Sequence, residues 1–160
     1  MRRSVTSVTG CRDVGSSLRA GQFFRLSGQS TALLIASCRR LLLGPNMILC
    51  IDDEATGLRI RKMLLQTQGY EVITALSGPE GLDLLDVHPF TAVIVDYSMP
   101  GMNGGEVAAE IKRRNPKVKV LMLSAHVDLP EEALRWVDKR SVKGIAPTAL
   151  LNDLQQLLSC

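Results

Sequence analysis

From Met47 onward, short apolar runs alternate with longer stretches in which apolar residues recur at helical spacing. The apolar runs are MILCI at 47–51, EVITAL at 71–76, AVIVD at 92–96, VKVLMLS at 118–124 and a weak run at 140–142. Between them, the spacing predicts helices over 55–68, from Ser77 toward Val87, over 104–114, over 130–137 and from Pro147 onward. This alternation favours an α/β fold, in which strands and helices follow one another along the chain.

The predicted strands are almost continuously apolar, which is typical of a parallel sheet covered by helices on both faces. About 114 residues, 47–160, hold five strand–helix units. We therefore predict one flavodoxin-like, doubly wound α/β domain with a five-stranded parallel sheet in the order 2-1-3-4-5. In that order the first and third strands are neighbours at the point where the order reverses. Ligands of such folds bind there, beyond the carboxyl ends of the strands.

Four of the predicted strands end at, or lead directly to, a polar residue. These residues are Asp52 and Asp53 after the first strand, Asp96 in the third, Ser124 in the fourth and Lys143 after the fifth. Because the carboxyl ends of parallel strands share one edge of the sheet, we expect these side chains to gather in one hollow open to solvent. A position for residue 96 at the opposite edge from residues 52–53 would contradict this prediction.

Three carboxylates in one place repel each other and have raised pKa values unless a counter-charge is present. Mg²⁺ binds oxygen ligands and commonly takes one or two carboxylates together with a phosphate oxygen. A carboxylate beside such an ion can accept a phosphoryl group, with Lys143 as a second cation. Taken singly, Asp53 or Glu54 could merely cap the following helix, and Asp96 could form a turn. We favour the acceptor site because all four strand ends carry fitting residues in the right order.

At these residues the chain resembles a response regulator receiver domain. The matching motifs are ILCIDDE at 48–54, VIVDYSMPGMNGGEVAAEIK at 93–112, VLMLSA at 120–125 and VKG at 142–144. The resemblance extends over about residues 47–159, and the combination of DDE with DYSMPGMNG makes it specific.

The resemblance implies a role for each candidate site residue. It makes Asp96 the phosphoacceptor, and it makes Mg²⁺ the cofactor, bound by Asp52, Asp53, Asp96 and the main-chain carbonyl of Ser98. It also implies that the hydroxyl of Ser124 moves toward the phosphoryl group and that Lys143 pairs with that group.

The resemblance further implies a receiver, which we expect to be a single domain, that takes its phosphoryl group from a sensor histidine kinase or a histidine phosphotransfer protein. The cysteine usage fits a reducing cytosol, so we expect it in the cytoplasm. It would catalyse only its own phosphorylation and dephosphorylation, and it would signal through an unknown protein without contacting nucleic acid or a membrane. An alternative is an interaction module that keeps the fold but does not depend on phosphorylation. A cofactor-binding protein of flavodoxin type is a third hypothesis, but the acidic DDEATG at 52–57 would repel the phosphate of a flavin.

Two positions depart from the usual pattern of the family. Lys143 is followed by Gly144, where proline is usual, and Arg140 occupies a position that is often aromatic. The region between Ser124 and Lys143 is also short. These departures motivate the interaction-module hypothesis and make the surface beside the fourth helix and fifth strand the least defined part of the prediction.

Several other residues are predicted to have structural roles. We expect Met99 and Met102 to pack in a loop, His126 to face solvent, Trp136 to be a half-buried helix residue, and Lys112, Arg113 and Arg114 to form a solvated helix end. The four cysteines, Cys11, Cys38, Cys50 and Cys160, form no CxxC pair. We therefore expect neither a zinc site nor a disulfide framework, and we place Cys50 in the core.

Residues 1–46 differ in composition from the rest, with seven arginines and a single acidic residue, Asp13. The positive charge of the chain belongs to this segment and does not indicate that the folded part binds nucleic acid. No apolar run approaches the roughly 20 residues of a membrane-spanning helix. A transit peptide, a secretory or lipoprotein signal processed at Cys38, and a disordered basic extension are all open interpretations. We favour a translation start at Met47, where the first strand begins.

Overall fold

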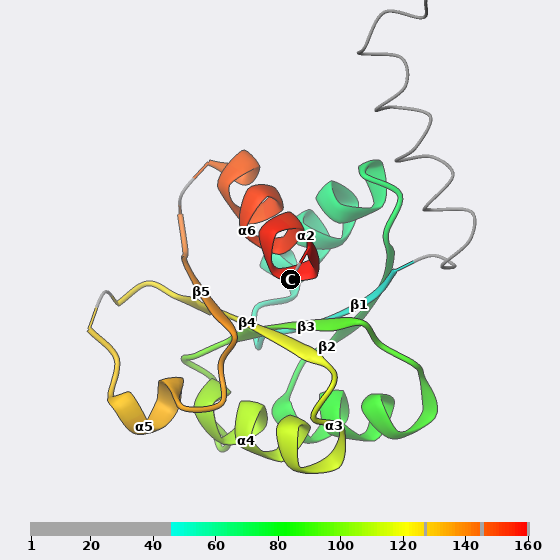
Figure 1. Cartoon of the computed structure of the whole chain (residues 1–160). Helices are drawn as coiled ribbons and strands as arrows, with labels where there is room; N and C mark the ends of the chain where they lie inside the picture. The colour runs from blue at the N-terminus through cyan, green and yellow to red at the C-terminus, as the bar shows by residue number, and fades with distance from the viewer. Residues whose placement is uncertain (1–45, 127, 145, 160) are drawn as a thin grey trace, which may run out of the picture. The chain divides into compact units, whose positions relative to one another are not determined.

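The computed structural model describes residues 46–126, 128–144 and 146–159, so the interpretations of residues 1–45 lie outside it. Five strands form one parallel sheet in the predicted order β2-β1-β3-β4-β5 (Figure 1). The strands are β1 (Met47–Ile51), β2 (Glu71–Ala75), β3 (Ala92–Asp96), β4 (Lys119–Ser124) and β5 (Lys139–Val142). The described helices are α2 (Ala55–Thr67), α3 (Gly78–Val87), α4 (Gly104–Arg114), α5 (Glu131–Leu134) and α6 (Pro147–Ser159).

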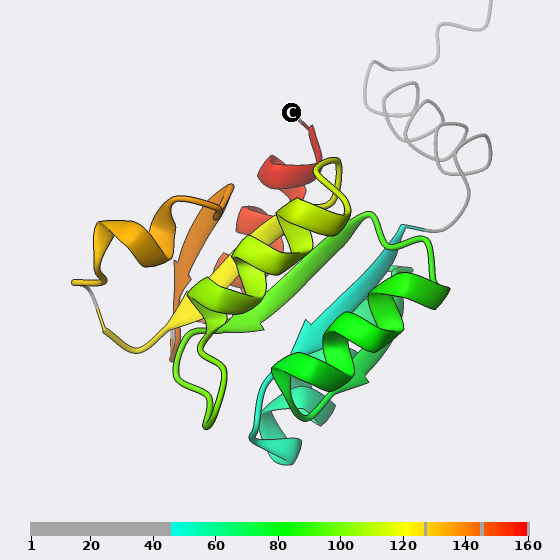
Figure 2. The same cartoon turned by 90° about the horizontal axis from the view of Figure 1, so that it is seen from below.

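Alternate residues of β1 supply two separate hydrophobic cores, one on each face of the sheet. Ile48 and Cys50 pack with residues of α2 and α6, whereas Leu49 and Ile51 pack with residues of α3 and α4. Figures 1 and 2 show this division, with α2 and α6 on one face and α3 and α4 on the other. Burial on both faces explains why the strands are continuously apolar, because successive strand residues point in opposite directions.

The register of β1 against β3 brings the predicted site residues together. Ile51 is paired with Val95, so Asp52 and Asp96, the next residues along, lie beside each other at the carboxyl edge. Cys50 is fully buried in this strand, as expected, and its burial raises the pKa of its thiol to about 12. The sheet therefore delivers two acidic side chains from adjacent strands to one place.

The sequence predicts that Leu58, Ile60, Met63, Leu64 and Leu65 form the apolar stripe of α2, and this prediction is only partly correct. Leu58 and Leu65 are buried, but Ile60 and Met63 are 61% and 67% exposed. A helix turns once every 3.6 residues, so positions 58, 61 and 65 share a face while 60 and 63 point away from it. The buried face of α2 therefore includes Arg61.

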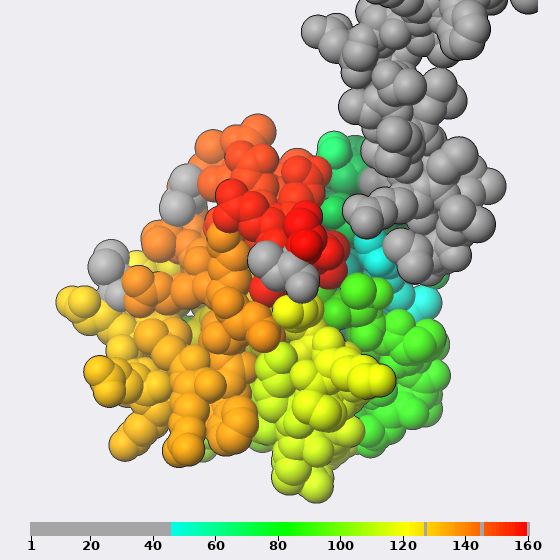
Figure 3. All heavy atoms as spheres, viewed as in Figure 1, coloured from blue at the N-terminus to red at the C-terminus, as the bar shows by residue number. Residues whose placement is uncertain are grey.

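The predicted helix over 130–137 is wrong in length, because α5 spans only Glu131–Leu134. The chain leaves α5 through a turn and enters β5 at Lys139, which leaves Trp136 outside the helix and 43% exposed. The guanidinium of Arg135 lies 5.4 Å from the centre of the Trp136 ring. Figure 3 shows that the α5 region and β5 share the surface on this side of the molecule with α6 and α4.

The end of α4 is less solvated than predicted. Lys112 contacts Asp138 at 2.6 Å and the carbonyl of Val118 at 2.8 Å, with only 14% of its side chain exposed. Arg114 reaches Asp86 of α3 at 2.7 Å, whereas Arg113 is 70% exposed. Two of the three basic residues therefore connect α4 to neighbouring segments, and only Arg113 matches the expectation of a solvated side chain.

Candidate functional site

Three carboxylates meet at the carboxyl edge of the sheet, as the sequence predicts. Asp52 follows β1, Asp96 ends β3, and one oxygen from each of these and from Asp53 lies within 4.8 Å of the others. Asp52 and Asp96 are almost completely buried, while Asp53 is exposed. The group thus combines two fixed carboxylates with one that faces solvent.

Lys143 joins this group from the carboxyl end of β5, a strand at the edge of the sheet. Its Nζ lies 2.8 Å from Oδ2 of Asp96 and 3.1 Å from Oδ2 of Asp52. Its backbone N–H donates to the carbonyl of Ser124 at 2.8 Å, which holds the residue beside the end of β4. The predicted convergence of the first, third and fifth strand ends is therefore present.

Gly144, which follows this lysine, explains one departure from the usual pattern. Its φ is +83°, in the left-handed region that glycine adopts readily. Proline is restricted to φ near −65° and could not take this conformation. The chain therefore leaves Lys143 in a direction that a proline at 144 would exclude.

Arg61 is the site residue that the sequence analysis missed. It contacts Oδ2 of Asp52 from α2, and the backbone N–H of Glu54 donates to Oδ1 of Asp52 at 2.9 Å. Glu54 occupies the N-cap position of α2, but its side chain makes no capping hydrogen bond among the described residues. The sequence could have indicated Arg61, because it lies at helical spacing from Leu58 and Leu65 and therefore on the same face of α2. A cation on a buried face requires a partner.

The three central groups titrate differently because their surroundings differ. Burial opposes ionisation of Asp52, but the hydrogen bond from Glu54 and the charges of Arg61 and Lys143 outweigh it and lower its pKa. Burial dominates at Asp96 and raises its pKa despite the contact with Lys143. Burial also opposes the charge on Lys143, yet its bonds to both carboxylates raise its pKa. The negative charge of Asp52 is thus better compensated by its neighbours than that of Asp96.

One carboxylate oxygen of Asp96 is unpaired within the described part of the chain. Its Oδ1 is buried and has no hydrogen-bond partner among the described residues. An unpaired buried carboxylate oxygen is costly, so it calls for a ligand from outside the chain. Mg²⁺ prefers hard oxygen ligands, and the three clustered carboxylates with this free oxygen fit such an ion.

The two serines of the predicted site are placed differently. Ser124 is buried, and its hydroxyl accepts from the N–H of His126 at 2.9 Å and donates to the carbonyl of the same residue at 3.1 Å. His126 is exposed, as expected. Ser98 is exposed in the loop after Asp96, and its backbone helps to lower the pKa of that carboxyl. The metal contact of the Ser98 carbonyl stays a prediction.

The loop after Asp96 is held closely against the strand. Met99 is buried and Met102 is partly buried against the core, as predicted. A Cβ at Gly104 would lie 2.3 Å from the backbone oxygen of Asp96, so only glycine allows α4 to begin there. Asn103 caps α4 by accepting from Gly105 at 2.9 Å, within a complete capping box. The Gly-rich turn therefore fixes the end of β3 against the start of α4.

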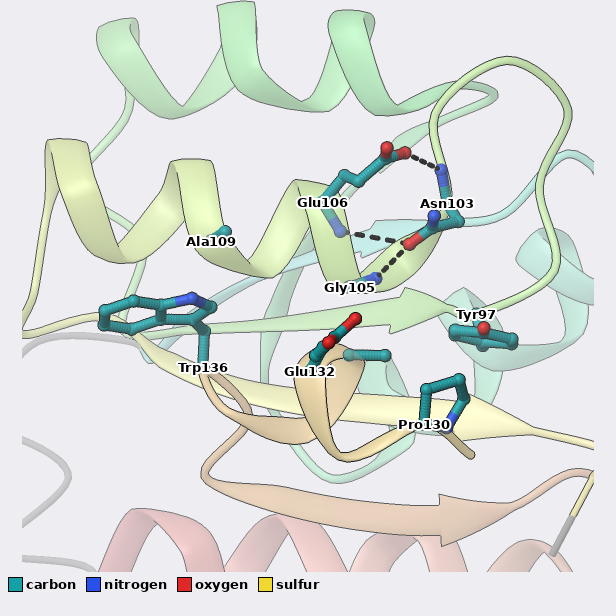
Figure 4. A pocket seen from close by; sticks show the side chains of 9 residues that line it. Tyr97, Asn103, Gly105, Glu106, Ala109, Pro130, Glu132 and Trp136 are labelled. Carbon is teal, nitrogen blue, oxygen red and sulfur yellow. Dashed lines mark hydrogen bonds between the residues drawn. The ribbon is translucent and has the colours of Figure 1, made fainter. Parts of the chain in front are cut away.

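A separate pocket of about 330 Å³ lies between α4 and α5. Figure 4 shows Tyr97 and Trp136 at its two ends, with Glu106 and Glu132 between them. Tyr97 follows Asp96 directly, so the pocket adjoins the end of β3, but Asp52, Asp53 and Asp96 are not among the residues that line it.

The fold and the site together define a doubly wound α/β domain with three clustered carboxylates and a lysine at its switch point. Residues 48–146 match the response regulator receiver domain family, and the chain belongs to that family. It is thus a receiver domain of the kind found in two-component response regulators. Such domains are signalling modules that generally interact with histidine kinases and downstream effectors.

Solved structures and curated relatives agree with this assignment. The response regulator TrrA of Thermotoga maritima, solved with Mg²⁺-BeF, is 32% identical with a TM-score of 0.67, covering 70% of this chain and 98% of that one. The chemotaxis protein CheY4 of Vibrio cholerae is 29% identical with the same TM-score, covering 71% and 99%.

Among curated relatives, the transcriptional regulatory protein GlrR of Escherichia coli is 37% identical over 87 residues, which cover 54% of this chain and 20% of GlrR. This chain thus matches only about a fifth of that protein's length. Among the described residues, no helix combines the length and the apolar character that crossing a membrane requires.

Proposed function

We propose that this chain accepts a phosphoryl group on Asp96 in a Mg²⁺-dependent phosphorelay and signals through a partner protein. The donor would be a phosphohistidine of a sensor histidine kinase or a histidine phosphotransfer protein, in the cytoplasm. The observation that carries the proposal is the unpaired, buried Oδ1 of Asp96, in a cluster with Asp52, Asp53 and Lys143.

In the proposed reaction, a carboxylate oxygen of Asp96 forms a bond to phosphorus while the bond from phosphorus to the histidine nitrogen breaks. The electron pair of that bond stays on the imidazole nitrogen, which is then protonated. Lys143 lies 2.8 Å from Asp96, so its ammonium would neutralise charge on the transferred group. Bound Mg²⁺, held by Asp52, Asp53, Asp96 and the carbonyl of Ser98, would neutralise the phosphoryl oxygens.

Ser124 would link the new charge to the rest of the molecule. Its hydroxyl is engaged with the backbone of His126, so reaching a phosphoryl group on Asp96 would require that local hydrogen bond to break. The segment after β4 would then shift between two arrangements, with phosphorylation favouring one of them. A partner protein that recognises one arrangement would receive the signal.

The alternative is an interaction module that does not depend on phosphorylation. The pairing of Arg61 with Asp52, the short α5 and the pocket beside Tyr97 support it. The two functions differ in one measurable property, the chemical state of Asp96 after exposure to a phosphodonor.

The deciding experiment incubates the full chain with acetyl phosphate and Mg²⁺ and measures the intact mass. We expect the gain of one phosphoryl group, which is lost in base and maps to the peptide containing Asp96. Asp96→Asn is the matched control, because it preserves shape and removes the nucleophile. An unchanged mass in the wild-type chain, with the fold verified by circular dichroism, would favour the interaction module.

A further inference from the structure

Arg61 occupies an unusual place for a helix arginine. Its side chain is only 14% exposed, and its guanidinium contacts the buried Oδ2 of Asp52. Arg59, two residues earlier on the same helix, is exposed to solvent. The two arginines thus carry the same charge on α2, but only Arg61 is shown in contact with the site.

The oxygens of Asp52 are already heavily used. Oδ2 contacts both Arg61 and Lys143, and Oδ1 accepts from the backbone N–H of Glu54. Asp96, in contrast, retains an unpaired oxygen, and Asp53 is exposed. A metal ion that uses Asp52 must therefore compete with a cation that the chain itself supplies.

Gly57 leaves room for the guanidinium. A Cβ at this position, one helical turn before Arg61, would lie 3.3 Å from Nη2 and 3.4 Å from Nη1 of Arg61. The contact with Nη2 would be tighter than most real Cβ contacts, so a side chain at this position would require the guanidinium to move slightly. The arginine passes over bare backbone at this point, which is consistent with a defined position.

The charge balance shows what Arg61 changes. If Lys143 were the one cation beside the three carboxylates, two negative charges would remain uncompensated. One divalent ion would neutralise them. Arg61 compensates one of these two charges. Attraction between charges inside a partly buried site is stronger than in bulk water, so a fixed cation there reduces the affinity for Mg²⁺.

We propose that Arg61 is an internal competitor of Mg²⁺ for Asp52. Metal entry exchanges the Arg61–Asp52 ion pair for a metal–carboxylate contact, and the arginine thereby sets the metal affinity of the site. This inference rests on the proposed function for the identity of the metal. It goes beyond that function in assigning control of metal loading to a residue outside the predicted site.

The test measures Mg²⁺ binding to the full chain by isothermal titration calorimetry, without any phosphodonor. We compare the wild-type chain with Arg61→Gln and with the matched control Arg59→Gln, which removes the same charge from the exposed side of α2. We expect Arg61→Gln to bind Mg²⁺ roughly three- to tenfold more tightly, and Arg59→Gln to stay within roughly twofold of wild type.

A second measurement follows metal binding in the wild-type chain itself and uses a variant only to assign one signal. Arginine side-chain NMR signals are followed during the Mg²⁺ titration, and Arg61→Lys identifies the signal of Arg61. We expect that signal to shift in step with metal binding as the guanidinium leaves Asp52. Saturation with Mg²⁺ without any such shift would overturn the proposal.

The remaining outcomes are also decisive. Equal Mg²⁺ affinity of the wild-type chain and Arg61→Gln shows that Arg61 only stabilises the fold, and the absence of Mg²⁺ binding in every chain removes the competition altogether. Failure of the proposed function is separate, because tighter binding by Arg61→Gln without phosphorylation of Asp96 leaves this inference standing. Normal phosphorylation with unchanged affinity overturns this inference alone.

Discussion

Helices α4 and α5 line the same pocket but are held in very different ways. α4 has eleven residues, a complete capping box and five buried positions. α5 has four residues, all described, of which none is buried, and no side-chain capping hydrogen bond is found there among the described residues. The strands differ likewise, because every residue of β3 is buried but only Ser141 of β5 is.

The residues of the site come from both of these regions. The carboxylates come from the acid-bearing half, residues 47–114, where packing fixes them. Lys143 comes from the α5 segment, residues 128–144, which has few buried apolar contacts and is tied to α4 by the polar Lys112–Asp138 contact. Regions with few buried contacts open at lower free energy than the core. If Asp96 is phosphorylated as proposed, the change of charge would act through Lys143 on the region with fewer buried residues.

We expect the largest difference in stability between alanine variants of two adjacent glycines, Gly104 and Gly105, at the start of α4. Alanine at 104 would place its Cβ 2.3 Å from the backbone of β3, whereas alanine at 105 would lie 2.9 Å from Ala133 of α5. We expect Gly104→Ala to lower the free energy of unfolding by about 3 kcal/mol or more, because β3 cannot move. Gly105→Ala should cost less, about 1–2 kcal/mol, because the backbone that must be displaced belongs to α5, in which none of the four described residues is buried. Urea denaturation measures both.

Helix propensity favours alanine over glycine equally in both variants, so the pair isolates the contact. Equal losses of stability would show that α5 is held as firmly as β3, and the comparison between the two regions would fail.

The second prediction repeats the comparison with side chains of equal size. Ile111 of α4 is completely buried, whereas Leu134 of α5 is only partly buried. We expect Ile111→Ala to lower the free energy of unfolding by about 2–5 kcal/mol, through lost burial and a residual cavity. Leu134→Ala should lower it by less than about 1 kcal/mol. The same urea measurement serves, and a larger loss from Leu134→Ala would reverse the assignment of the two regions.

The smallest effect concerns the charge of Asp96 and its pH dependence. Burial raises the pKa of Asp96 in the folded chain above its ordinary value, so its ionised form destabilises the fold at neutral pH. Asp96→Asn should therefore raise the free energy of unfolding by about 1 kcal/mol, which would appear as a higher urea midpoint. The difference should shrink as pH falls through the raised pKa, because the wild-type carboxyl then becomes neutral as well.

Urea midpoints of both chains over a pH series check this sign. A difference that persists unchanged in acid would assign the effect to packing around the asparagine instead of to the charge.

Much of the fold could be predicted from local pattern. β1 and β3 and helix α4 begin and end where the sequence analysis places them, because apolar runs, glycine and the Asn103 cap are local signals. The errors concentrate where local signals are weak. The segment 130–137 has helical composition, but its C-terminal part turns toward β5, so the helix is short.

The convergence of Asp52, Asp96 and Lys143 could also be predicted, since strand order and strand ends determine which residues meet. The hydrogen-bonded state of Ser124 could not, because it depends on the path of the backbone at His126.

The amino-acid sequence was enough to predict an α/β domain with three acidic residues and a lysine at one edge of a parallel sheet. Those properties follow from periodicity and from the order of residues along the chain. The folded structure was needed to show that Arg61 belongs to the site and that Lys112 joins two segments. A long basic side chain can reach several partners, and only the packing of α2 and α4 against the sheet selects one of them.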